Sequence, residues 1–286
     1  MALVTLDYEM KKAMKGGYAV AAFNFFTLDN LIGIVLGAQR TKSPVIAMAS
    51  VGAMKIMGEK LVVKACEGVS QDYGIDMVLH LDHCTDYDMI RRAVDNGFTS
   101  VMIDASKLNY DENVEITSRV VEYASKYGVS VEAELGHVGG KEDDIVVSER
   151  DALFTVPEDA VRFVKNTGVD ALAVAVGTVH GFYKSEPKLD FPRIEKISEL
   201  TGGVPLVLHG GTGVPDNDFR KAIELGIRKI NVGTELKVNG VFRVSKDGYN
   251  EDKDEDPRSV SKKVIARCAA IVEEKITVMG SVNKAG

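Results

Sequence analysis

The sequence predicts an α/β protein whose strands close into a (β/α)8 barrel, the TIM fold, as a single domain over residues 1–286. Three observations indicate this fold: short apolar runs recur eight times, amphipathic segments separate them, and polar residues gather where the runs end. Successive runs begin roughly 24 to 42 residues apart, which fits one strand, one helix and two turns. A doubly wound sheet is the alternative, but no G-x-G-x-x-G motif follows the first run.

The eight expected strands are short and rich in the residues typical of buried strands. In chain order they cover Tyr18–Phe25, Pro44–Ser50, Asp76–His83, Ser100–Ser106, Val129–Gly136, Ala171–Thr178, Val204–Gly211 and Lys229–Thr234. With 286 residues and 45% hydrophobic composition, the chain can bury a core large enough for one such barrel.

Amphipathic helices are expected between these strands. Asp111–Tyr127 carries its apolar residues on one face, and Pro157–Asn166 begins with a proline and is followed by Gly168. Pro215–Leu225 likewise ends before a glycine. A last helix over Pro257–Thr277, within residues 257–280, is expected to pack outside the barrel and to reach a partner subunit.

Two connections are unusually long for a compact domain. Gly136–Val156 contains two consecutive glycines and an acidic stretch, and loops of this length are often lids or binding loops. Gly240–Asp256 ends in the charged run Glu251–Asp256 and is expected to be a loop, either solvated or functional.

Charge and composition exclude several classes of protein. The net charge is −7 and no basic tract is present, which argues against nucleic-acid binding. No apolar run reaches the roughly 18 residues needed to span a membrane, and the acidic N-terminus does not resemble a signal peptide. Three widely spaced cysteines indicate reduced thiols and a cytoplasmic protein. Cys84 follows a histidine and could ligate a metal, but a small residue in a tight turn is the favoured interpretation.

Polar residues fall at or just after the carboxyl ends of the expected strands, where barrels of this kind build their active sites. They are Asn24, Ser50, Asp82, His83, Asp104, Glu134, His180, His209, Asn231 and Thr234.

Three of these residues are histidines from strands three, six and seven, namely His83, His180 and His209. A catalytic zinc ion takes about three protein ligands and keeps one position open. Each histidine alone could be a hydrogen-bonded residue, but together they predict a zinc site. His80 shares a strand face with the neighbouring Asp82 and is expected to be a buried core residue, and His137 is not expected to be a ligand.

Asp104 and Glu134 form a second pair of acids at strand ends. They could ligate a displaced zinc ion or hold the histidines in place. Simple hydrogen bonding in the barrel mouth is the alternative.

Glycine-rich segments follow the last two strands. His209-Gly210-Gly211-Thr212-Gly213 and Asn231-Val232-Gly233-Thr234 offer backbone N–H groups and hydroxyls to an anion. Because the loops after strands seven and eight are the usual phosphate site of such barrels, these segments predict a phosphate-binding site.

A metal, a phosphate site and a strand-end acid together indicate retro-aldol cleavage of a sugar phosphate, in which a carboxylate moves the hydroxyl proton. The Schiff-base alternative needs a lysine at the catalytic face. Strand six has none, and Lys229 is expected to begin strand eight, at the opposite end.

The chain resembles the class II, zinc-dependent ketose-bisphosphate aldolases, the family of fructose- and tagatose-bisphosphate aldolases. The resemblance runs from Ala21 to Ser281. Its most specific motifs are Leu79-His80-Leu81-Asp82-His83, Glu134-Leu135-Gly136-His137-Val138-Gly139-Gly140, Gly177-Thr178-Val179-His180-Gly181-Phe182-Tyr183-Lys184 and Leu208-His209-Gly210-Gly211-Thr212-Gly213-Val214-Pro215.

The resemblance implies the roles of the site residues. Asp82 would act on the C4 hydroxyl, the three histidines would hold zinc, and Glu142 would exchange a proton with the dihydroxyacetone-phosphate carbanion. Asp104 and Glu134 would line an alternative, buried metal position. Arg258 would reach the far phosphate, often across a dimer interface. The remaining substrate and phosphate positions would be Asn24, Ser50, Gly181, Lys184, Gly210, Gly211, Thr212, Asn231, Gly233 and Thr234.

The resemblance also implies a monovalent cation, Na⁺ or K⁺, near the first phosphate, and a homodimer or homotetramer. The sequence departs from the family pattern after Asn24, at Met48 and at Ala105-Ser106-Lys107. Another ketose 1-phosphate or a deoxy-keto sugar-acid phosphate is therefore an alternative substrate. A metal-dependent hydrolase and a non-catalytic sugar-phosphate sensor are the alternative functions.

Overall fold

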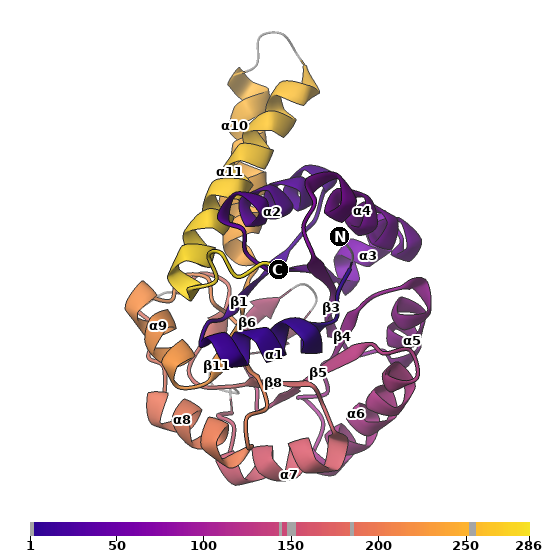
Figure 1. Cartoon of the computed structure of the whole chain (residues 1–286), viewed down its shortest axis with the longest axis vertical. Coiled ribbons are helices and arrows are strands. Elements are labelled where there is room, and N and C mark those ends of the chain that lie inside the picture. Colours follow the sequence, from indigo (N-terminus) through magenta and orange to yellow (C-terminus); the bar gives the residue numbers. More distant parts are fainter. Residues whose placement is uncertain (1–2, 143–144, 148–152, 184–185, 252–255) are drawn as a thin grey trace.

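The computed structural model describes residues 3–142, 145–147, 153–183, 186–251 and 256–286. Its parallel strands close into a barrel in the order β1-β11-β10-β8-β5-β4-β3-β2 (Figure 1). These strands are β1 Val20–Asn24, β2 Val45–Ser50, β3 Met77–Cys84, β4 Ser100–Ile103, β5 Ser130–Leu135, β8 Ala171–Val174, β10 Leu206–Leu208 and β11 Ile227–Val232. Each of the eight predicted strands is confirmed, as is the barrel.

Helices surround the barrel (Figure 1). They are α2 Leu28–Thr41, α3 Val51–Met57, α4 Glu59–Tyr73, α5 Tyr87–Asn96, α6 Tyr110–Ser125, α7 Pro157–Thr167, α8 Phe191–Leu200, α9 Asp216–Glu224 and α11 Pro257–Met279. Local signals set the helix ends. Gly168 ends α7 in the left-handed conformation, as expected, and Asn109 and Glu112 form a capping box at the start of α6.

The segment Gly240–Asp256, expected as a loop, is largely helical, and that prediction was wrong. A π-helix, η1 Leu236–Phe242, continues into α10 Arg243–Glu251. Val241 and Val244 pack on the core, and an added Cβ at Gly248 would lie 3.2 Å from Val260 of α11. The helix is therefore stabilised by packing on α11, which outweighs its weak local propensity. Residues 252–255 of the charged run lie outside the described part of the chain.

The other long connection, Gly136–Val156, contains two short strands, β6 Gly139–Glu142 and β7 Ile145–Val147. They form an antiparallel pair, and β6 also pairs in parallel with β9, Val179–His180. A small sheet thus joins this connection to the segment that carries His180, above the carboxyl end of the barrel.

The amino-terminal end of the barrel is closed by α1, Leu6–Gly16, which crosses the opening (Figure 1) and was not anticipated. Apolar residues of α1, among them Leu6, Met10 and Ala13, join a core inside the barrel with residues such as Ile46 and Val207. No described helix is long and apolar enough to cross a membrane.

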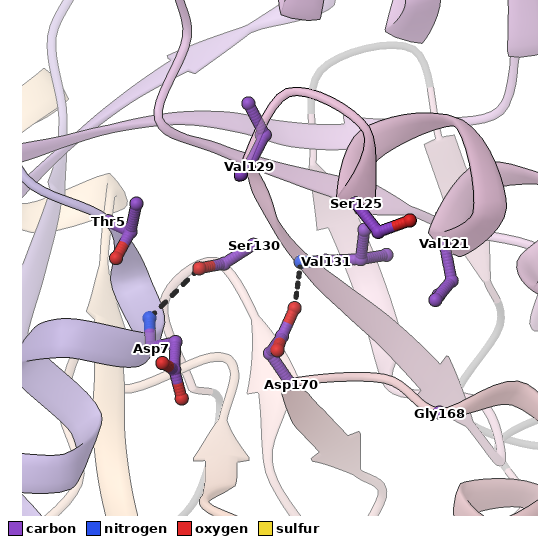
Figure 2. A pocket seen from close by; sticks show the side chains of 10 residues that line it. Thr5, Asp7, Val121, Ser125, Val129, Ser130, Val131, Gly168 and Asp170 are labelled. Atoms are coloured by element: carbon purple, nitrogen blue, oxygen red, sulfur yellow. Dashed lines mark hydrogen bonds between the residues drawn. The ribbon is translucent and has the colours of Figure 1, made fainter.

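Beside α1 lies a polar hollow of about 260 Å³. The backbone N–H of Asp7 donates to Ser130 Oγ at 2.9 Å, and Asp170 accepts from the N–H of Val131 at 2.7 Å (Figure 2). The first contact holds α1 against the start of β5, and the second joins β5 to the residue before β8. The hollow therefore lies at the opposite end of the barrel from the carboxyl ends of the strands.

Candidate active site

The pair Asp82–His83 ends β3 at an irregularity. The pairing of β3 with β4 shifts between Leu81 and Cys84, and His83 has a φ of 45°, in the left-handed region that non-glycine residues rarely adopt. Successive residues of a regular strand point to opposite faces. The bulge lets both side chains reach polar partners of the barrel mouth: Asp82 accepts from Asn24 Nδ2 at 2.8 Å, and His83 Nδ1 lies 2.9 Å from Asp104 Oδ2.

The three predicted zinc ligands come together at this end of the barrel. The ring centroid of His83 lies 5.0 Å from that of His180 and 4.6 Å from that of His209, and the last two are 5.8 Å apart. One nitrogen from each ring lies within 4.8 Å of the others. Three converging imidazoles are a donor set that zinc prefers, so the residues fit the predicted ion.

A second donor set shares His83. Its ring nitrogen and carboxylate oxygens of Asp104 and Glu134 lie within 4.8 Å of one another, and all three residues are buried. The geometry is compatible with the displaced metal position expected from the sequence, and Asp104 also supports His83 through their hydrogen bond.

Carboxylates orient two of the rings. Because Asp104 engages Nδ1 of His83, its Nε2 is the ring nitrogen that can serve as a metal ligand. His209 has the reverse arrangement: its Nε2 lies 2.9 Å from Glu132 Oε1, and its Nδ1 lies 3.2 Å from Glu134 Oε2.

These contacts shift the pKa values of Asp104 and His209. Burial disfavours the charge on Asp104, but hydrogen bonds from His83 and Ser106 outweigh it and hold the pKa of that carboxyl well below its usual range. Burial would also lower the pKa of His209, but hydrogen bonds to Glu132 and Glu134 prevail and raise that pKa to about 9. In the metal-free protein, His209 is therefore a cation between two carboxylates.

A small hollow adjoins the histidines at the ends of β8, β10 and β11. It is lined by His180, Gly181, Gly210, Gly211, Thr212, Asn231, Gly233 and Thr234. The residues named for the first phosphate thus converge, as the order of the strands predicts.

Two of these glycines are required by backbone packing. An added Cβ at Gly210 would lie 2.4 Å from the carbonyl oxygen of Val179, and one at Gly211 would lie 2.7 Å from that of Asn231. Glycine therefore lets the three loops come close enough to form a single hollow.

Two predicted substrate residues, Ser50 and Arg258, do not line this hollow, and the side chains of the predicted acid Glu142 and of Lys184 lie outside the described part of the chain. Ser50 pairs with Asp82 across β2 and β3, and its hydroxyl caps α3 by accepting from the N–H of Ala53. Arg258 is the second residue of α11, with its side chain 85% exposed and paired with Asp256. The backbone of Glu142 belongs to β6, but its side chain and all of Lys184 lie outside the described part.

The expectation that His80 is a buried core residue is confirmed: it is fully buried, with Nδ1 2.8 Å from Ser100 Oγ. Cys84 is also buried, but it is the last residue of β3 rather than part of a tight turn.

Glu132 and Lys229 are the functional candidates that sequence reasoning missed. Lys229 was expected to begin its strand, but β11 begins at Ile227, so that prediction was wrong and Lys229 lies within the barrel. Both residues are fully buried, and Lys229 Nζ lies 2.8 Å from Glu132 Oε2. The alternation of side chains along a strand could have identified both residues. Glu132 stands two residues before Glu134, and Lys229 two residues before Asn231, so each shares a strand face with a predicted site residue.

Comparison with known proteins identifies the family of the chain. The sequence model of the family "Fructose-bisphosphate aldolase class-II" matches residues 4–284. Fructose-bisphosphate aldolase of Geobacillus stearothermophilus is 45% identical over 288 residues, covering all of this chain and 99% of the relative. The fructose-bisphosphate aldolase of Staphylococcus epidermidis is 45% identical over 289 residues and the full length of both chains.

A solved structure, that of the YdjI aldolase of Escherichia coli K12, superposes with a TM-score of 0.86 at 32% identity and covers 99% of this chain and all of the other. Full-length similarity, the barrel and the converging histidines lead to one conclusion. The chain belongs to the class-II fructose-bisphosphate aldolase family.

Proposed function

We propose that the enzyme reversibly cleaves fructose 1,6-bisphosphate to dihydroxyacetone phosphate and glyceraldehyde 3-phosphate. The observation that carries this proposal is the placement of Asp82, three clustered histidines and a glycine-lined hollow at one end of the barrel. The names of the full-length relatives support the choice of sugar.

The proposed metal is one zinc ion held by His83, His180 and His209. When bound, zinc supplies Lewis-acid polarisation of the substrate carbonyl. Asp104 keeps the ring of His83 in one orientation, and Glu134 lies close enough to His209 and His83 to offer the second metal position.

Asp82 is the proposed base for the C4 hydroxyl. It is almost completely buried, and the hydrogen bond from Asn24 holds one carboxylate oxygen in place. In cleavage, Asp82 takes the hydroxyl proton, the C3–C4 bond breaks, and its electron pair stays on C3 while C4 becomes the aldehyde carbon. Glu142 is proposed to return a proton to C3.

The first phosphate is proposed to lie in the hollow after β8, β10 and β11. Backbone N–H groups there, with the hydroxyls of Thr212 and Thr234, suit an anion. A monovalent cation, Na⁺ or K⁺, is proposed beside it, and Ser50, Lys184 and Arg258 are proposed to bind the rest of the substrate. Because Arg258 lies on the projecting α11, we also propose that the chain forms a homodimer or homotetramer.

The test is release of dihydroxyacetone phosphate from fructose and tagatose 1,6-bisphosphate, measured in parallel with and without a chelator. We expect release from the fructose substrate, its loss on chelation and its recovery with added zinc. Release that resists chelation would contradict the metal site. Inactivity toward both sugars with zinc bound would instead favour a different phosphorylated ketose.

The same assay tests Asp82. Asp82→Asn keeps the side-chain shape but cannot accept the C4 proton, so we expect a rate loss of about 100- to 10,000-fold with zinc still bound. Asp216→Asn, on the outer helix α9, is the control and should retain full activity. An active Asp82→Asn enzyme would remove Asp82 from the mechanism.

A further inference from the structure

A fully buried ion pair lies inside the barrel beneath the candidate active site. Lys229 on β11 and Glu132 on β5 are both 0% exposed, with 2.8 Å between Nζ and Oε2. Two strands, β10 and β8, separate β11 from β5 in the barrel order. The pair therefore crosses the barrel interior rather than joining adjacent strands.

Stability alone is a poor explanation for this pair. Removing two ions from water costs several kcal/mol per ion in general, and apolar residues of similar volume often stabilise a protein as well or better. The surrounding barrel interior shows that apolar packing is available, since Ile46, Met48 and Val78 are fully buried in it.

The second oxygen of Glu132 connects the pair to the metal site. Oε1 lies 2.9 Å from Nε2 of His209, so one carboxylate engages both the lysine and the histidine. With its proton on Nε2, His209 offers Nδ1 as the metal ligand, on the side of the ring that lies 3.2 Å from Glu134 Oε2.

Glu132 also has a competing neighbour. Nε2 of His80 lies 3.7 Å from Oε2, beyond hydrogen-bond distance, while the other ring nitrogen of His80 contacts Ser100. Lys229 occupies Oε2 and so keeps the carboxylate from rotating toward His80 and away from His209.

We propose that Lys229 and Glu132 are positioning residues that fix the proton of His209 on Nε2 and so present Nδ1 to the metal ion. This role rests on the proposed function, because it assumes that His209 is a zinc ligand. It explains why an ion pair is kept inside the barrel and why the two acids of β5, Glu132 and Glu134, contact opposite nitrogens of one ring.

The test removes both charges together, because a single substitution would leave one buried charge uncompensated. In Glu132→Leu/Lys229→Met the hydrogen bond and both charges are lost. In Glu132→Gln/Lys229→Met the charges are lost but an amide oxygen can still accept from Nε2. Zinc affinity is measured by competition with a chromophoric chelator, and folding of the metal-free variants by thermal melting.

We expect the Leu/Met variant to bind zinc about 10- to 100-fold more weakly, and the Gln/Met variant to recover most of that loss. The matched control is Glu9→Leu/Lys12→Met at the other end of the barrel, where Glu9 is also buried and paired with Lys12. Its zinc affinity should equal that of the unaltered protein. Unchanged affinity in a folded Leu/Met variant would overturn the proposal.

Two further results separate the inference from the proposed function. In the unaltered zinc-loaded protein, ¹⁵N NMR should show the His209 proton on Nε2, and a proton on Nδ1 would overturn the inference even if the variants do not fold. Failure of the unaltered protein to bind zinc through its histidines would instead contradict the proposed metal centre.

Discussion

At the scale of single residues, backbone irregularity brings the chemistry of Asp82 and His83 together. Regular alternation would separate the two side chains, but the bulge at the end of β3 and the left-handed φ of His83 bring both to the barrel mouth. Backbone strain of this kind clusters at functional sites. His83 then gains a fixed orientation from Asp104.

His209 makes the stability of the metal-free protein depend on pH. Its pKa is about 9 in the folded chain, above the usual 6.5, because hydrogen bonds to Glu132 and Glu134 outweigh its burial. The resulting stabilisation is fully present below about pH 6.5 and is lost as pH rises through about 9. Urea unfolding of the zinc-free protein at pH 6, 7.5 and 9.5 should show this decrease.

The control is His209→Leu, in which this contribution is absent at every pH. We expect its unfolding free energy to change less across the same interval. If the two proteins showed identical pH profiles, the hydrogen-bonded imidazolium would not be the cause.

At the scale of elements, close packing between α2 and α11 attaches the last helix to the barrel. An added Cβ at Gly33 would lie 2.9 Å from the carbonyl oxygen of Ile265, and one at Gly37 would lie 2.8 Å from that of Ala269. The two helices are therefore in backbone contact along α2. The sequence predicted that the last helix would pack outside the barrel, but it did not identify α2 as the partner.

Gly37→Ala should force α2 and α11 apart. We expect the free energy of unfolding to fall by about 1–3 kcal/mol, because the methyl group meets backbone that cannot move locally. Gly68→Ala in α4 is the matched control, since nothing lies within 4 Å of its added Cβ. That substitution should raise the free energy by roughly 0.5–1 kcal/mol through helix propensity, and equal effects at both positions would refute the packing argument.

At the scale of the whole molecule, the barrel is closed by α1 at one end and carries the candidate site at the other. An arm, formed by α10 and the adjoining part of α11, projects beyond the ring of helices (Figure 1). Phe242, the residue just before α10, and Tyr249 within α10 are 67% and 64% exposed. Large exposed aromatic side chains are typical of interface residues, which supports the proposed oligomer.

Sedimentation velocity at micromolar concentration checks the oligomer directly. We expect a dimer or tetramer, and Phe242→Asp/Tyr249→Asp should shift it toward the monomer because it places charges in an apolar contact. Tyr127→Asp, at an exposed aromatic residue that follows α6, is the control and should leave the assembly unchanged. A monomeric unaltered protein would contradict the proposal.

The positions at which the sequence departs from the family pattern differ in burial, which only the whole molecule shows. Met48, one of the departures noted with the family resemblance, is fully buried in the core inside the barrel. This change therefore does not alter an exposed rim, whereas Lys107 is exposed after β4. The sequence alone did not show that Met48 is a core residue and Lys107 a surface residue.

The sequence by itself determined the fold class, all eight barrel strands and the residues clustered at their carboxyl ends. It could do so because hydrophobic runs, helix caps and strand-end polar residues are local signals, and a parallel barrel brings equivalent strand ends together. The convergence of His83, His180 and His209 follows from strand order once the barrel is known.

Only the tertiary structure decided the bulge at His83, the helical arm, the closing helix α1 and the ion pair between Glu132 and Lys229. Each depends on contacts between segments far apart in the chain, whose energies exceed the local preferences that a sequence displays. Glu132 shows the difference most clearly. Alternation places it inside the barrel, but its partners His209 and Lys229 lie 77 and 97 residues away, and only folding brings their charges into contact.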